Sequence, residues 1–134
     1  MLKHVNIPAI ISGVFVTFAI DLILNIFHPF SHDVGIYWYI ASSVGGITTG
    51  FIAKRRGFVN GLIALIIASI IPEAAGLSAS LYSLATATPE FKQSALLIVQ
   101  SFFKIENIFN DIILSGFLGG LGGIFGMWIS KNNE

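Results

Sequence analysis

The chain has 134 residues, of which 54% are hydrophobic and 10% are charged, and its formal net charge is zero. Soluble domains average roughly 25% charged residues, and so few polar side chains could not cover a soluble fold of this length. The zero net charge gives no reason to expect a nucleic acid partner. The absence of cysteine excludes disulfides and thiolate metal sites. The composition predicts one all-α integral membrane domain over residues 1–134.

The first two apolar stretches are each long enough to cross a bilayer core of ~30 Å at 1.5 Å per residue. The first covers residues 8–27, carries Asp21 and lacks a signal-peptide cleavage site, so we expect it to remain in the protein. The second covers residues 35–53 and opens with Tyr37, Trp38 and Tyr39. Such a cluster is typical of an aromatic belt at the membrane surface.

The third apolar stretch, residues 58–82, contains Pro72. We expect this helix to continue past the proline with a kink, because the residues before Pro72 are too few to span. Residues 91–104 place their polar side chains on one face, which suits a helix in the membrane interface. A loop helix packed on the bundle is an equally good interpretation. The fourth stretch, residues 108–129, completes a predicted bundle of four transmembrane helices.

Basic residues are unevenly distributed between the connecting segments. With four spans, Lys92 and Lys104 lie on one side of the membrane and all the other basic residues lie on the opposite side. The positive-inside rule then predicts a multi-pass cell-membrane protein with both termini in the cytoplasm. Three cations in one turn would also attract anionic lipid, at about 1 kcal/mol each. The basic residues of the cytoplasmic side are Lys3, Lys54, Arg55, Arg56 and Lys131.

Glycines recur at a four-residue spacing in the second and fourth apolar stretches. Small residues at this spacing let helix backbones approach closely, which is how helices pack where lipid supplies no hydrophobic driving force. The spacing predicts tight helix packing, either within the chain or in an oligomer interface. The glycines concerned are Gly46, Gly50, Gly116, Gly119, Gly120, Gly123 and Gly126.

The segment 45–53, followed by a basic turn and by Gly57-Phe58-Val59-Asn60-Gly61, resembles a group of small four-helix prokaryotic membrane proteins. These are domains of unknown function, notably in methanogenic archaea, and their last helix is similarly rich in glycine. The resemblance covers about half of the chain. It implies a four-span membrane protein, and it brings no activity and no functional residues.

Polar side chains inside the apolar stretches are the only candidates for chemistry. Counting 1.5 Å per residue, Asp21, Glu73 and Asp111 all fall in the outer half of the bilayer, about 5–9 Å from its edge. An acid at that depth costs on the order of a few kcal/mol and is by default a functional-site hypothesis. Asn25 and His28 follow Asp21 at helical spacing and extend a polar stripe along the first helix.

Two interpretations of these polar groups remain open. One is an outward-facing cavity that binds a cation or relays protons, with Asp21 as its deepest group. The other is a set of hydrogen bonds between helices that determines their packing register. We expect no metal site, because Pro29 separates His28 from His32 and prevents a regular helix from presenting both.

The sequence contains no phosphate-binding glycine loop, no Ser/His/Asp order and no zinc-protease motif. We therefore expect no enzyme and no cofactor. The first functional interpretation is a structural or accessory helical bundle that contacts the lipid bilayer and joins a homo-oligomer or a larger membrane complex. The alternative is a small ion- or proton-coupled channel or transporter with its polar cavity around Asp21.

Overall fold

The computed structural model describes residues 5–27, 34–102 and 104–133. Within these ranges the chain is almost entirely helical and contains no strand, so the all-α class is confirmed. Each of the four predicted apolar stretches falls inside one helix. The helices are α1 (Ile7–Phe27), α2 (Val34–Ala53), α3 (Gly57–Thr86), α4 (Lys92–Phe102) and α5 (Ile105–Asn132).

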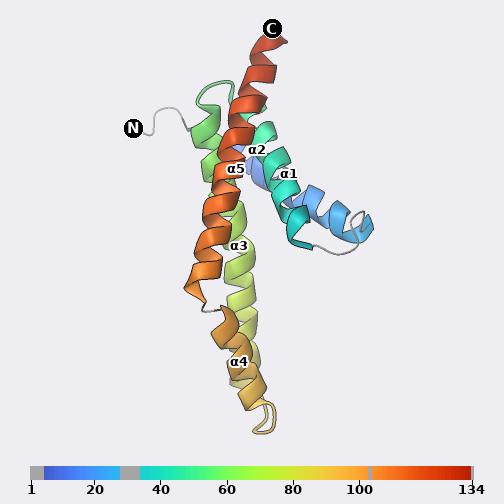
Figure 1. Cartoon of the computed structure of the whole chain (residues 1–134), viewed down its shortest axis with the longest axis vertical. Helices are drawn as coiled ribbons and strands as arrows, with labels where there is room; N and C mark the ends of the chain where they lie inside the picture. The colour runs from blue at the N-terminus through green and yellow to red at the C-terminus, as the bar shows by residue number, and fades with distance from the viewer. Residues whose placement is uncertain (1–4, 28–33, 103, 134) are drawn as a thin grey trace.

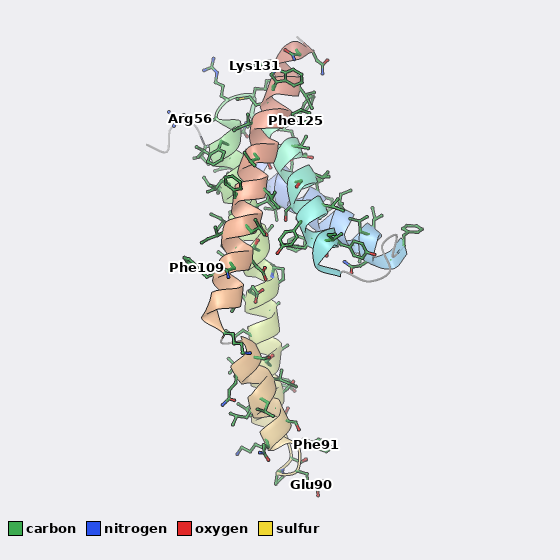
Figure 2. The ribbon with its side chains drawn as sticks, in the orientation of Figure 1. Arg56, Glu90, Phe91, Phe109, Phe125 and Lys131 are labelled. Atoms are coloured by element: carbon green, nitrogen blue, oxygen red, sulfur yellow. The ribbon has the colours of Figure 1, made fainter. Side chains whose placement is uncertain are left out.

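Two long helices, α3 and α5, run side by side in opposite directions (Figure 1). The hairpin of α1 and α2 packs against one half of this pair and slants away from it at its free end. Along the other half of α3, α4 takes the place of α5 (Figure 1). Arg56 and Lys131 lie at one end of the molecule and Glu90 lies at the other (Figure 2). We call the first the basic end.

Among the described residues, α1, α3 and residues Ile108–Asn132 of α5 are long and apolar enough to cross a membrane. The fourth predicted span, α2, has 20 residues but does not reach that apolarity. Its aromatic cluster, its serines and threonines and its glycines lower the mean hydropathy. This helix contacts α1, α3 and α5, and its apolar side chains Ile36, Ile40, Phe51 and Ile52 are exposed.

The start of α1 is tied to the start of α3 by two asparagines. Asn6 caps α1, because its Oδ1 accepts a hydrogen bond from the Ala9 N–H at 3.1 Å. The Asn6 N–H donates to Oδ1 of Asn60 at 2.9 Å. The Asn60 amide donates in turn to the main-chain oxygens of Arg55 and Arg56, at 3.1 and 3.2 Å. Asn60 is completely buried, so it holds three backbone segments together at the basic end.

The turn between α2 and α3 is strained. Lys54 and Arg56 have φ angles of 56° and 50°, a left-handed conformation that costs a non-glycine residue on the order of 1 kcal/mol or more. Glycine would adopt it without that cost. The side chains of Lys54, Arg55 and Arg56 are nevertheless all exposed.

The glycine face of α5 is enclosed between α2 and α3. A β-carbon built on Gly46 or Gly50 of α2 would overlap the α5 backbone at Gly119 or Gly123, respectively. From the other side, Gly57 and Gly61 of α3 approach the same two α5 glycines just as closely. A β-carbon on Gly126 would overlap the α2 backbone. Three helix backbones therefore meet at one set of glycines, where any side chain would push them apart.

Gly116 and Gly120 face α3 under different constraints. A β-carbon on Gly120 would lie 2.6 Å from the ring of Phe58, and one on Gly116 would lie 3.1 Å from Cγ1 of Ile66. Both glycines meet side chains first, which can shift more easily than a backbone. All seven glycines predicted to pack thus approach another helix of the same chain.

A second close crossing, between α1 and α2, was not anticipated from the sequence. A β-carbon on Gly13 would overlap the hydroxyl of Thr49, and one on Gly45 would overlap that of Thr17. The Thr17 hydroxyl donates to the Gly13 carbonyl, and the Thr49 hydroxyl donates to the Gly45 carbonyl, each at 2.9 Å. The Gly-xxx-Thr spacing in both helices is the signal that could have predicted this crossing.

The connecting helix α4 packs along the far half of α3 (Figure 1). Its buried side chains are Ala95 and Val99, which are spaced one turn apart on a single face. This arrangement matches the interpretation of residues 91–104 as a loop helix packed on the bundle. Pro72 lies inside α3, which continues past it to Thr86 as one helix.

Candidate functional site

A cavity of about 380 Å³ opens where the α1–α2 hairpin diverges from α3 and α5. All four of these helices contribute to its wall, and we call it the acidic cavity. Among its described lining residues none is basic. They are Phe18 and Asp21 from α1, Trp38 and Tyr39 from α2, Ser69, Pro72 and Glu73 from α3, and Asp111 and Ile112 from α5.

The three acids predicted at similar depth line this one cavity, each from a different helix. Asp21 follows the start of α1 by about 21 Å and Glu73 follows the start of α3 by about 24 Å, at 1.5 Å per residue. Both helices start at the basic end, and both carboxyls lie beyond the midpoint of their helix. Asp21 and Glu73 are partly buried, and Asp111 is exposed at the rim.

Aromatic rings from α1 and α2 form the apolar wall. The Trp38 Nε1–H donates to the Ser115 hydroxyl on α5 at 2.9 Å, and the Tyr39 hydroxyl donates to Oδ1 of Asp111 at 3.2 Å. The rings of Phe18 and Trp38 have centroids 6.1 Å apart. Both α2 side chains therefore connect the hairpin to α5 across the cavity.

The prediction that residues 37–39 form a surface belt is wrong for at least one member. Tyr37 is completely buried, while Trp38 and Tyr39 are partly buried and bonded to α5. Tyr37 is buried because α2 packs against α1, α3 and α5. Three consecutive aromatic residues in the sequence do not show which of them faces the other helices.

The polar residues predicted to form one stripe along α1 lie in different surroundings. Thr17 belongs to the α1–α2 crossing. The Asn25 side-chain amide donates to the main-chain oxygen of Asp21 at 2.8 Å and is not part of the cavity lining. His28 lies outside the described residues. Asp21 is thus the member of the stripe that the structure brings into the cavity.

Two further α3 residues, Ser69 and Pro72, line the cavity. Pro72 has no N–H, so the Ala68 carbonyl one turn earlier lacks its usual helical donor. The Ser69 hydroxyl donates to the Leu65 carbonyl at 2.8 Å, so its oxygen retains acceptor capacity. The proline break thus makes this part of α3 richer in hydrogen-bond acceptors than an unbroken helix would be.

The lining suits a cation better than an anion or a coordinated metal. Three carboxyl groups without a basic neighbour among the described lining residues attract positive charge in a low-dielectric setting. Within the described part of the chain, no three His, Cys, Asp or Glu side chains are placed to hold a metal ion together. The three carboxyls come from three different helices and line one space.

The basic turn contributes to a different and more open hollow. This second cavity, of about 410 Å³, lies at the start of α1 and is lined by Arg55 together with residues 5–8 and Ala53. Arg55 is exposed, and an exposed cation beside a bilayer can approach a lipid phosphate. The lipid contact predicted for the turn stays a prediction.

Comparisons with protein-family models, with curated proteins and with solved structures found no match to this chain. The resemblance to small archaeal membrane proteins stays a prediction. The acidic cavity therefore has to be interpreted from its own chemistry.

Proposed function

We propose that the chain is a four-span membrane protein whose acidic cavity binds a cation on the outer side of the membrane as a step in its transport. The observation that carries the proposal is the convergence of Asp21, Glu73 and Asp111 on one cavity. Carboxyls are costly inside a bilayer, and three helices place one each around the same space. A cation in that space offsets the repulsion between them.

The hydrogen bond between Asn6 and Asn60 supports α2 as the fourth span. This bond places the starts of α1 and α3 at the same end of the molecule. The chain leaves that end through α1 and begins α3 there again. If α1 and α3 cross the bilayer, α2 has to carry the chain back across it, even though its mean hydropathy is lower.

Topology can be tested with reporter fusions. A fusion at the C-terminus should report a cytoplasmic location, and insertions after residue 31 and after Glu90 should report the outer side. The reason is that four crossings return the chain to its starting side, with the basic turn inside. If α2 did not cross, the C-terminal fusion would lie on the opposite side from the N-terminus. That result would contradict the proposed topology.

Asp21 is the residue on which the proposed function can be tested most directly. In proteoliposomes we expect Asp21→Asn to weaken cation binding and uptake about 10- to 100-fold, since interactions with a charged partner contribute roughly 1.5–3 kcal/mol. The amide has nearly the same shape, so the helical content by circular dichroism should stay unchanged. Uptake should be measured separately for Na⁺, K⁺ and tetraethylammonium.

Glu90→Gln is the matched control for Asp21→Asn. It removes the same charge from an exposed position at the end of the molecule far from the basic turn (Figure 2), and it should leave uptake unchanged. Equal loss in both variants would indicate a general effect of net charge. Absence of binding and uptake in the unmodified protein would rule out the proposal.

A structural or accessory bundle is the second candidate, and the glycine crossings favour it. The packing glycines form close contacts within the chain, so one chain has the tight core that a scaffold needs. In this case Asp21 serves packing. Asp21→Asn would then be harmless and Asp21→Leu would destabilise the bundle without any cation flux to lose.

A further inference from the structure

We infer that the cation taken by the acidic cavity is an organic one, an alkylammonium whose charge is spread over apolar groups. The inference rests on the proposed function and names its ligand class. It stands on three properties of the cavity, which are its volume, its aromatic wall and its three acids.

The volume is that of a small-molecule site. About 380 Å³ falls within the ~300–1,000 Å³ typical of pockets for organic ligands, whereas one water molecule takes up only ~30 Å³ in the liquid. A single inorganic ion would leave most of this space to be filled by water against aromatic rings. An alkylammonium fills it with groups that the rings can contact.

The aromatic side chains that line the cavity can bind an organic cation. Cations are attracted to the faces of aromatic rings, most strongly to tryptophan, and quaternary ammonium groups are bound in this way. Trp38 is held in place by its hydrogen bond to Ser115, and Phe18 lies beside it at a tilt of 53°. Tyr39 adds a third ring to the lining. Three aromatic side chains thus line the space, where an inorganic cation would need oxygen ligands.

The three acids line the cavity from three different helices. Hard cations such as Mg²⁺ and Ca²⁺ need several oxygens at ~2.0–2.6 Å, and no three acidic or histidine side chains within the described residues are so placed. Asp111 already accepts a hydrogen bond from Tyr39. Coulomb attraction falls only with the inverse of distance, so dispersed carboxylates still stabilise a bulky cation that none of them touches closely.

The fluorescence of Trp38 can report ligand binding in the cavity. The chain has two tryptophans, Trp38 in the cavity wall and Trp128 near the end of α5, so Trp128→Phe leaves Trp38 as the single fluorophore. In this background, in nanodiscs, titration with tetraethylammonium should give a saturable change in Trp38 emission. Tetraethylammonium has no N–H, so it isolates the contribution of charge and ring faces.

Variants of Phe18 test the aromatic contribution. Phe18→Leu should weaken tetraethylammonium binding about 2- to 30-fold, the range of one cation–π contact. Phe18→Tyr keeps a ring and should retain affinity, so a loss limited to leucine is not a folding defect. Glu90→Gln should bind normally. Unchanged binding in Phe18→Leu would overturn recognition by the rings.

Parallel titrations with Na⁺, K⁺ and Mg²⁺ separate this inference from the proposed function. A saturable response to one of these ions and none to tetraethylammonium would overturn the organic ligand class and leave cation binding intact. No response to any cation would overturn both.

Discussion

Gly50→Ala and Gly123→Ala should each destabilise the protein by an amount near the upper end of the ~1–3 kcal/mol typical of overpacking. A β-carbon on Gly50 would overlap the backbone of Gly123, and one on Gly123 would overlap the backbone of Gly57. Neither clash can be relieved by a side-chain rotation, so helices have to separate. The free energy of unfolding should be measured by circular dichroism in mixed micelles with an increasing fraction of denaturing detergent.

Gly116→Ala is the control on the same helix. Its β-carbon would meet Cγ1 of Ile66 at 3.1 Å, and a flexible side chain can move by the small distance required. Alanine is the better helix former by about 1 kcal/mol, so this variant should be neutral or slightly stabilised. Equal stability of Gly116→Ala, Gly50→Ala and Gly123→Ala would contradict the three-helix glycine contact.

Asn60→Leu should cost about 2–4 kcal/mol of unfolding free energy, because it leaves the Asn6 N–H and two main-chain oxygens without their partner. The effect should be strongest at the basic end, where Asn60 holds the 54–56 turn. Limited trypsin digestion gives a second readout, since this turn consists of Lys54, Arg55 and Arg56. Cleavage there should be faster in the variant.

Two further substitutions test the assignment of individual hydrogen bonds. Asn60→Asp keeps an acceptor for the Asn6 N–H but places a buried carboxylate oxygen against the main-chain oxygens of Arg55 and Arg56, so it should be at least as destabilising as Asn60→Leu. Asn110→Leu changes an exposed asparagine on α5 and should shift stability by less than about 0.5 kcal/mol. Comparable losses of unfolding free energy for Asn60→Leu and Asn110→Leu would show that the Asn60 hydrogen bonds do not stabilise the protein.

The sequence was enough to predict about where each helix begins and ends and where a residue lies along it. Apolar runs, prolines and basic turns mark where a helix enters and leaves a bilayer, because exposed polar groups are excluded from it. Each predicted stretch accordingly falls within one helix. The similar distances of Asp21 and Glu73 from the starts of α1 and α3 also followed from counting residues, since the rise per residue of an α-helix is constant.

Only the tertiary structure shows which helix packs against which face of another helix. Spacing shows that Gly119 and Gly123 share a face, but it does not show that α2 and α3 both pack there. The bond between Asn6 and Asn60 joins residues 54 positions apart, and Tyr37 is buried because of neighbours that the local sequence does not name. A periodic pattern specifies an axial position and a direction around one helix, whereas contacts depend on how several helices cross. The grouping of three acids in one cavity is such a contact, and so is the packing of α2 against three helices.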